Sequence, residues 1–577
     1  MGKVSAFKSV KAISTRRKRR VLWLGLMIAS LASSVLAADK PRPNILLLVA
    51  EDMSSRVGAF GDKVAVTPHL DRMAKEGVRY TQVFATAGVC APSRAAIITG
   101  VSQVEIGAQH MRTSSYTQSP YRSVPAANIK AFPELLRAEG YYTYTDKKLD
   151  YQFSGTGSSS GPFTIWSDEG LGTHWRNREG SEAFFGMVNF MVTHESGLFP
   201  SPSLPVNLSL LSLQLLHSYY QWGEQEVVMA EDVELPPYYP DTALIRKDIA
   251  RHYNNIHIMD KQVGVIVQQL KDDGLDESTI VIWTTDHGDG LPRSKREIYD
   301  SGIKVPMIIR WPEQFRPTDV EEGAFDHRLV SFLDLAPTIM DLAGVDIPDY
   351  MNGNVFAGTN KSDEPSYIYA AKDRMIEVED RQRAVRDKRF KYIRNYHPEN
   401  PGAEPLAFRD NLDVMQELWR YHHADKLKGV QKTWFEPRAA EELYDTHQDS
   451  HEVHNLASDP LYENELARLR TALDQWLQVS DDQGEIAEIA EIDMAQKFWP
   501  EARQPQTELP TVMYDKERSQ LHLSEATTGA SIGYRKNEGA WKLYRHAVRI
   551  EPHDSVEIKS VRYGWKESEL LVWSAAD

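Results

Sequence analysis

Two short apolar runs in the chain each lead into a group of charged or polar residues. Residues 45–50 precede Glu51 and Asp52, and residues 280–283 precede Asp286 and His287. Continuous apolar runs of this length are typical of strands that are buried on both faces of a sheet. We therefore predict two buried strands whose carboxyl ends carry carboxylate and imidazole groups.

Helical patterns lie between and around these strands. The candidate helices are residues 70–76, 133–139 and 242–272, and the longest repeats apolar residues at Ile249, Tyr253, Ile256, Val263 and Val267. We place His252 of this helix on the surface. Strands and helices that alternate over about 300 residues predict an α/β fold, with a mainly parallel sheet flanked by helices in residues 38–365.

The rest of the chain has a different pattern. Residues 366–500 combine short strands, such as 390–393, with a helix at 461–479, which predicts a smaller sheet packed on the main domain. A segment rich in Pro, Gln and Glu at 500–510 reads as a linker. Residues 511–577 are predicted to form an all-β, sandwich-like tail, with strands at 530–535, 541–544, 556–561 and 570–573.

The N-terminus has the pattern of a secretory signal. Basic residues 16–20 precede an apolar stretch at 21–36, and Val35 and Ala37 occupy the small-residue positions of a cleavage site. The stretch is short for a membrane span, although an anchor remains the alternative. We expect residues 1–37 to be removed, leaving a secreted or periplasmic protein with no membrane attachment.

Composition limits the partners. A formal net charge of -16 argues against nucleic acid as a ligand, and an anionic substrate would require a local basic pocket. Cys90 is the only cysteine, so the chain has no internal disulfide. An unpaired thiol in an exported protein is open to oxidation, which suggests a chemical role, whereas the alternative is a small buried apolar residue.

The charged strand ends predict a metal site. In an open α/β sheet the carboxyl ends of parallel strands meet at one edge, so Glu51, Asp52 and Asp286 would repel one another without a cation between them. Carboxylates favour Ca²⁺ or Mg²⁺, and the nitrogen of His287 would also tolerate Mn²⁺ or Zn²⁺. The alternative is that each group lies in a solvated loop.

Cys90 begins a short predicted helix. Pro92 suits the first turn and Gly100 suits the stop. The helix N-terminus favours an anion, and Arg94 lies one turn further on. The segment therefore combines a nucleophile, an anion site and a fixed cation.

This Cys-x-Pro-Ser-Arg segment resembles the signature of the sulfatase family. Further family-like segments are residues 67–71, 299–306, 334–338 and 442–445, so the resemblance extends over about residues 42–457. The pattern is most similar to the sulfamidase-like branch. The resemblance implies an alkaline-phosphatase-like fold, one Ca²⁺ with Mg²⁺ and Mn²⁺ as alternatives, and oxidation of Cys90 to formylglycine by a formylglycine-generating enzyme before folding.

The resemblance also implies roles for individual residues. Asp52 and Asp286 match metal ligands, whereas Glu51 replaces an aspartate and His287 stands where many relatives have asparagine. The predicted catalytic residues are Cys90, Arg94, Lys148, His194 and Lys295, and the metal ligands are Glu51, Asp52, Cys90, Asp286 and His287. Lys148 and Lys295 would contact sulfate and His194 would face the leaving group; Asp150 replaces a family histidine. Arg296, beside Lys295, is the alternative contact to sulfate. Apart from the resemblance, further candidate substrate contacts are His110 and Arg112, which follow the Cys90 helix, and Asp373 and Arg374, with a structural role as the alternative for each pair.

The predicted reaction is hydrolysis of a sulfate ester or sulfamate on a glycosaminoglycan or other sulfated polysaccharide. A sulfate ester that leaves as an alkoxide requires a proton donor and fixed cations. Two alternatives remain: a phosphodiesterase or phosphonate hydrolase of the same superfamily, and a carbohydrate-binding protein with an inactive site. The identity of the sugar, and the choice between O-sulfate and N-sulfate, stay open.

Overall fold

The structure is a computed structural model that describes residues 42–112, 121–157, 159–200, 208–485, 496 and 498–575. The predicted signal segment, residues 1–37, lies outside these ranges. Within them, no helix combines the length and apolar character needed to cross a membrane.

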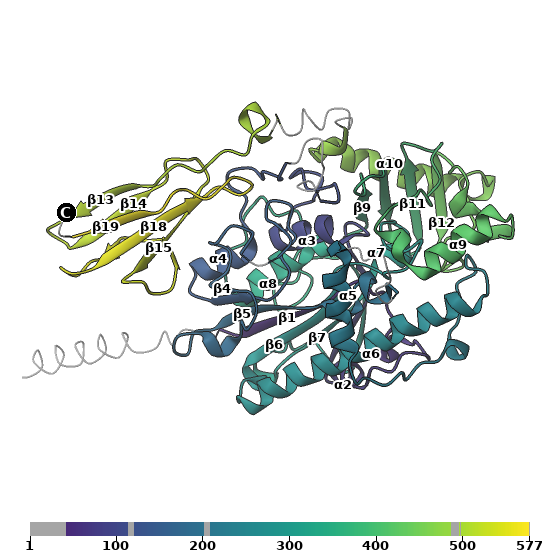
Figure 1. The fold of residues 1–577 in the computed structure, drawn as a ribbon, viewed down its shortest axis with the longest axis horizontal. Coiled ribbons are helices and arrows are strands. Elements are labelled where there is room, and N and C mark those ends of the chain that lie inside the picture. The colour runs from purple at the N-terminus through teal and green to yellow at the C-terminus, as the bar shows by residue number, and fades with distance from the viewer. Residues whose placement is uncertain are drawn as a thin grey trace, which may run out of the picture. The chain divides into compact units, whose positions relative to one another are not determined.

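A large sheet forms the centre of the described chain (Figure 1). Its eight strands are, in spatial order, β4 (Asp168–Glu169), β3 (Tyr142–Thr145), β5 (Phe184–Phe190), β1 (Asn44–Ala50), β6 (Thr279–Thr285), β7 (Lys304–Arg310), β2 (Gly77–Phe84) and β8 (Phe325–Ser331). Only β7 runs antiparallel to its neighbours among these described strands. The predicted mainly parallel α/β fold is therefore confirmed, and β1 and β6 are the two predicted apolar strands.

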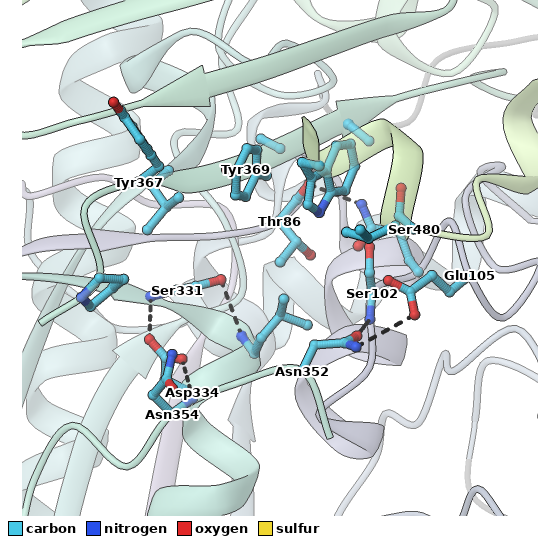
Figure 2. Close-up of a pocket in the computed structure, with 18 residues that line it drawn as sticks. Thr86, Ser102, Glu105, Ser331, Asp334, Asn352, Asn354, Tyr367, Tyr369 and Ser480 are labelled. Atoms are coloured by element: carbon cyan, nitrogen blue, oxygen red, sulfur yellow. Dashed lines mark hydrogen bonds between the residues drawn. The ribbon is translucent and has the colours of Figure 1, made fainter. Parts of the chain in front are cut away.

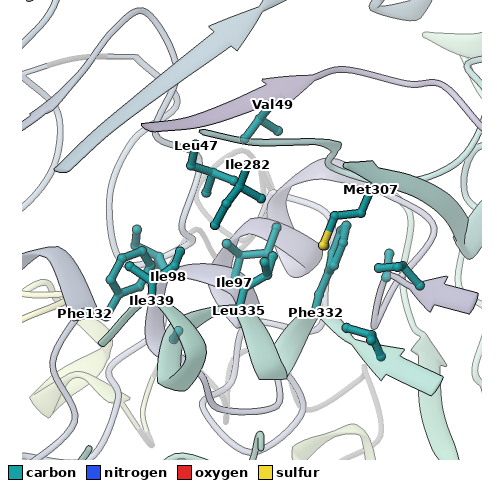
Figure 3. Close-up of a cluster of buried hydrophobic side chains, with 14 of the residues drawn as sticks. Leu47, Val49, Ile97, Ile98, Phe132, Ile282, Met307, Phe332, Leu335 and Ile339 are labelled. Carbon is teal, nitrogen blue, oxygen red and sulfur yellow. The ribbon is translucent and has the colours of Figure 1, made fainter. Parts of the chain in front are cut away.

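Helices cover both faces of this sheet. Ile45, Leu47 and Val49 of β1 pack toward α3 (Cys90–Thr99), α4 (Phe132–Ala138) and α8 (Leu335–Ala343) (Figure 3). The alternate residues of β1 pack toward α2 (Pro68–Glu76) and α6 (Ala243–Asp272). Because successive side chains of a strand point to opposite faces, a strand between two helix layers must be apolar throughout.

The long helix α6 begins one residue later than predicted. Thr242 is its N-cap and accepts a hydrogen bond from the backbone N–H of Ile245 at 3.2 Å. The placement of His252 on the surface was wrong: its side chain is fully buried, and Nε2 lies 3.3 Å from Asp289 Oδ1. The segment that follows β6 packs against this part of the helix, which periodicity alone could not reveal.

Smaller antiparallel sheets complete the described fold. One contains β9 (Ile368–Lys372), β10 (Gln382–Arg386), β11 (Phe390–Asn395) and β12 (Glu441–Asp445), and α10 (Glu463–Val479) packs on it. The tail contains two sheets. The first consists of β13 (Thr511–Asp515), β14 (Gln520–Ser524) and β17 (Val548–Arg549). The second consists of β15 (Ser531–Lys536), β16 (Lys542–Leu543), β18 (Ser555–Val561) and β19 (Leu571–Ser574). Both tail sheets contribute to one apolar core. The predicted domain boundaries stay a prediction.

Three further helices are α5 (Leu208–Gln221), α7 (Asp300–Ile303) and α9 (Asp413–His423). The four tail strands predicted from sequence correspond to β15, β16, β18 and β19, whereas β13, β14 and β17 were not predicted.

The core packing predicts a large difference between two leucine truncations. Leu47→Ala should lower the free energy of unfolding by about 2–5 kcal/mol, because Leu47 is fully buried beneath the helices. Leu461→Ala is the matched control, since Leu461 is 85% exposed and should change stability by less than about 0.5 kcal/mol. Urea unfolding measures both, and equal losses would contradict the assignment of this core.

Candidate active site

The two predicted charged groups meet at one sheet edge. β1 and β6 are parallel neighbours, with Ala50 paired to Thr285, so Glu51-Asp52 and Asp286-His287 emerge side by side. The backbone N–H of Asp52 donates to Asp286 Oδ1 at 3.1 Å. All four side chains are fully buried, which excludes the alternative of solvated loops.

Helix α3 brings Cys90 to the same point. Cys90 Sγ lies 3.3 Å from His287 Nε2 and 3.8 Å from Asp52 Oδ1. Ser93 Oγ donates to the backbone oxygen of Asp286 at 2.6 Å, which holds the first turn of the helix against the end of β6. Arg94 Nε lies 3.1 Å from Asp286 Oδ2, and its guanidinium also reaches Glu51 Oε1 at 3.2 Å.

These residues fit a metal ion. Potential ligand atoms of Asp52, Cys90, Asp286 and His287 all lie within 4.8 Å of one another, and Glu51, Asp52, Cys90 and His194 form an overlapping set. Burial disfavours the imidazolium of His287, but Asp286 and Asp52 outweigh burial and raise its pKa to about 10. The carboxylates therefore attract a positive charge at this point, and a divalent ion would satisfy the same demand with oxygen and nitrogen ligands.

Two lysines complete the charge balance. Lys295 Nζ lies 2.5 Å from Asp52 Oδ2, and Lys148 Nζ lies 2.6 Å from Glu51 Oε2. Burial raises the pKa of Glu51, whereas for Asp52 Lys295 overcomes the effect of burial and holds its pKa well below the usual range. Both lysines stay protonated against the effect of burial, because Cys90 and Glu51 raise the pKa of Lys148, and Asp52, Cys90 and Glu195 raise the pKa of Lys295.

A cavity of about 600 Å³ opens beside these lysines. Its basic and imidazole lining residues are Arg112, Lys147, Lys148, His194, Lys295 and Arg296, and its apolar lining includes Met191, Leu213, Leu216, Tyr220 and Phe408. A second cavity of about 390 Å³ is lined by Tyr367 and Tyr369 on one side and by Ser102, Glu105 and Asn352 on another (Figure 2). Trp476, which also lines this cavity, stacks on Tyr369. No described lysine, arginine or histidine lines this second cavity, so the larger one is the better site for an anion.

The candidate substrate residues fall into two groups. Arg112 and Arg296 line the larger cavity; Arg112 pairs with Asp150 at 2.8 Å, and Arg296 pairs with Glu195 through two hydrogen bonds. His110, Asp373 and Arg374 are buried and are not among the described lining residues. His110 Nδ1 accepts from the backbone N–H of Arg374, and Asp373 pairs with Arg383 at 2.9 Å.

The backbone is strained around this cavity. Asp52, Arg112, Lys147, Asp150 and Arg296 have φ values of 50°, 57°, 45°, 60° and 75°, in the left-handed region that non-glycine residues rarely adopt. Each such residue costs on the order of 1 kcal/mol, and strain of this kind gathers where side chains must be held in defined positions.

A close approach brings the Lys295 segment to Cys90. The backbone N–H of Arg296 donates to the oxygen of Gly88 at 2.6 Å. A Cβ added to Gly88 would lie 2.1 Å from the oxygen of Glu297, so only glycine allows this contact.

Sequence reasoning missed several buried residues of the site. Asn189 near the end of β5 accepts from Arg94 at 2.8 Å, and the rule that sites gather at strand ends could have found it. Ser196 Oγ lies 2.7 Å from His194 Nδ1 and 2.8 Å from His217 Nε2, and no pattern in the sequence links His217 of α5 to this site.

The comparisons with known proteins agree with this geometry. The family model described as Sulfatase matches residues 43–345, more than half of the 577 residues, and the chain therefore belongs to the sulfatase family. A second model, described as N-sulphoglucosamine sulphohydrolase, C-terminal, matches residues 292–434. These matches confirm the resemblance inferred from the sequence motifs, including the sulfamidase-like branch.

Individual relatives support the same assignment. An ulvan-active sulfatase of Formosa agariphila is 41% identical over 567 residues, which cover 93% of this chain and 92% of the relative. The human N-sulphoglucosamine sulphohydrolase is 26% identical over 487 residues, 77% of this chain and 91% of the relative. A solved 2-O GAG sulfatase aligns with a TM-score of 0.53 at 20% identity, over 78% of this chain and 94% of its own, and shows the same fold.

The ligand cluster predicts stabilisation by calcium. An ion that binds only the folded state adds about 2.7 kcal/mol to the free energy of unfolding when its free concentration is one hundred times its Kd. We expect Ca²⁺ added after chelation to raise the thermal midpoint of the wild type, and Asp286→Asn to abolish most of this rise. Asp346→Asn, at an exposed aspartate, is the control and should respond as the wild type does. An undiminished rise in Asp286→Asn would place the ion elsewhere.

The burial of His217 predicts an acid-sensitive stability. Burial lowers its pKa from 6.5 to about 4, with a further lowering by Arg251 and an opposing effect of Asp52. Since the folded-state pKa lies below the unfolded-state value, this contribution is present above pH 6.5 and is lost as the pH falls toward 4. Between neutral pH and pH 4, the free energy of unfolding of the wild type should therefore fall by roughly 3 kcal/mol more than that of His217→Gln.

Urea unfolding between pH 7 and pH 4 measures this effect. His546→Gln is the matched control, because His546 is exposed. Parallel pH curves for the wild type and His217→Gln would contradict the prediction.

Proposed function

We propose that this chain is an exported sulfatase that removes sulfate from a sulfated polysaccharide, with formylglycine at position 90 and one Ca²⁺ as its metal. The observation that carries the proposal is the position of Cys90 Sγ, 3.3 Å from His287 Nε2, between a carboxylate cluster and the lysines that line the cavity. A divalent ion held by Glu51, Asp52, Asp286 and His287 would supply Lewis-acid chemistry there.

The residues of the chain supply the remaining functions. Lys148 and Lys295 line the cavity as buried cations, which is what the oxygens of a sulfate group require in a site shielded from water. His194 lines the same cavity, and burial together with Lys295 lowers its pKa well below the usual range. A neutral imidazole there can donate a hydrogen bond to a leaving oxygen.

The shape of the cavity supports a carbohydrate. The cavity is lined both by basic residues and by an apolar wall that includes Met191, Leu216 and Phe408. A sugar ring has polar edges and an apolar C–H face, so it can present sulfate to the lysines and a C–H face to the wall. The local positive charge also meets the requirement that an acidic protein, with a net charge of -16, must have a basic pocket for an anionic polymer.

The names of the relatives support a proposal for the substrate class. The Formosa relative is named an ulvan-active sulfatase, and we propose a sulfate ester of an ulvan-type polysaccharide as the substrate. The match to the C-terminal model of N-sulphoglucosamine sulphohydrolase favours hydrolysis of an N-sulfated glucosamine as the second candidate. The predicted signal segment supports a secreted or periplasmic location.

The burial of Cys90 supports its conversion before folding. The side chain is fully buried in the folded chain, so a modifying enzyme would need the unfolded segment. A formylglycine-generating enzyme is therefore the proposed maturation partner.

The test combines product analysis with mass spectrometry. Protein co-expressed with a formylglycine-generating enzyme should release sulfate from ulvan oligosaccharides and from 4-nitrophenyl sulfate, and should release much less phosphate from 4-nitrophenyl phosphate. Its Cys90 peptide should carry an aldehyde, and Cys90→Ala should be inactive. Desulfation of N-sulfated glucosamine alone would favour the second candidate.

Protein produced without the modifying enzyme is the control. An unmodified thiol at position 90 in a fully active preparation would overturn the mechanism, and release of phosphate in place of sulfate would favour the phosphodiesterase alternative.

A further inference from the structure

His194 is held from the side of Nδ1 by two buried polar side chains. Its Nδ1 lies 2.7 Å from Ser196 Oγ, which in turn lies 2.8 Å from His217 Nε2. The three residues are 7%, 1% and 3% exposed. A polar chain this deeply buried is costly unless its members satisfy one another, so its geometry is tightly determined.

The chain joins two separate elements. Ser196 belongs to the short 3₁₀ helix Glu195–Leu198, and His217 belongs to α5. Gly197 lies between them, and a Cβ added there would be 3.0 Å from His217 Nδ1 and 2.8 Å from Asn255 Nδ2. Glycine at this position therefore lets the imidazole of His217 approach Ser196.

The backbone determines which nitrogen of His194 carries the proton. The N–H of Ser196 donates to His194 Nδ1 at 3.3 Å, and a backbone N–H cannot accept, so Nδ1 presents its lone pair. An imidazole whose Nδ1 is unprotonated carries its single proton on Nε2. Lys295 Nζ lies 3.3 Å from that nitrogen and has the carboxylates of Asp52 and Glu195 to accept its own protons.

His217 reinforces this arrangement. With its Nε2–H donating to Ser196 Oγ, the hydroxyl proton of Ser196 is free to bond His194 Nδ1. The single lone pair of Nδ1 then faces two donors, the Ser196 hydroxyl at 2.7 Å and the Ser196 N–H at 3.3 Å, and both favour the tautomer with the proton on Nε2.

We propose that Ser196 and His217 are positioning residues that aim the Nε2–H of His194 at the leaving-group oxygen of the substrate. The inference deepens the proposed function and rests on it. In the overall hydrolysis, an oxygen that comes from water forms the new bond to sulfur, and the bond between sulfur and the leaving oxygen breaks. The leaving oxygen keeps the electron pair of the broken bond, and the Nε2–H hydrogen bond stabilises the charge that develops there. Water, the second substrate of hydrolysis, supplies the proton that the product finally carries.

This role has a distinctive kinetic consequence. A hydrogen bond to the leaving oxygen matters most when that oxygen is strongly basic, as in a sugar or phenyl sulfate, and least for 4-nitrophenolate, whose charge is delocalised. A defect that only loosened the fold would slow all substrates alike.

The experiment compares Ser196→Ala with the wild type on an ulvan-derived oligosaccharide, phenyl sulfate and 4-nitrophenyl sulfate. We expect kcat for the oligosaccharide and for phenyl sulfate to fall about 10- to 100-fold and kcat for 4-nitrophenyl sulfate to fall less than about threefold, with little change in KM. Ser218→Ala is the matched control, because Ser218 is exposed on α5 and its hydrogen bond within the described part of the chain goes to the backbone oxygen of Gln214.

A second pair of variants tests His217 and protects against misfolding of Ser196→Ala. His217→Leu should reproduce the same dependence on the leaving group, whereas His217→Gln, whose amide can donate to Ser196, should restore most of the activity. Thermal unfolding confirms that each variant is folded.

The outcomes separate the two claims. A wild type that releases sulfate from none of the three substrates contradicts the proposed function itself. An active wild type whose folded Ser196→Ala and His217→Leu variants lose the same factor on every substrate overturns the positioning role and leaves the proposed function intact.

Discussion

Three fully buried carboxylates, those of Glu51, Asp52 and Asp286, share one edge of the central sheet, where no solvent screens their repulsion. Such a cluster is stable only when positive charge of matching geometry surrounds it. The cations that supply it reach in from separate segments: Arg94 from α3, Lys148 from the segment after β3, and Lys295 from the segment after β6. The demand for charge balance therefore ties these segments together.

The same demand explains the position of the nucleophile. Arg94 can reach Asp286 and Glu51 only if α3 points its first turn at the ends of β1 and β6, and this places Cys90 beside His287. The hydrogen bond between Arg296 and Gly88 holds the segment that carries Lys295 and Arg296 against the residues just before Cys90. Five non-glycine residues of the site adopt left-handed backbone conformations of higher energy, and this cost is tolerated because the conformations hold the side chains in place.

Features that depend on local pattern could be predicted from the sequence. The apolar runs located β1 and β6, their charged ends converged as expected, and α3 begins at Cys90 and stops at Gly100. Features that depend on packing between distant segments could not be predicted. The antiparallel β7 and the burial of His252 against Asp289 arise from tertiary contacts that leave no clear period in the chain. The tail strand β14 is different, because Leu521 and Leu523 alternate with polar residues and this pattern could have located it.

The residues of the candidate site also fall into those that a local sequence pattern identifies and those that only tertiary packing brings together. Motif residues such as Cys90 and Arg94 were accessible from the sequence, whereas Ser196 and His217 meet only because α5 folds back over the segment after β5. Asp373 is paired with Arg383, a contact that no pattern in the sequence indicated, and its role as a substrate contact stays a prediction.

Anomalous diffraction from crystals of the mature protein grown with Ca²⁺ or Mn²⁺ tests the central claim most directly. The account predicts one strong peak bonded by side-chain atoms of Glu51, Asp52, Asp286 and His287, with the side chain of residue 90 in contact with it. A peak elsewhere, or none at this sheet edge with residue 90 turned away from the carboxylates, would contradict it.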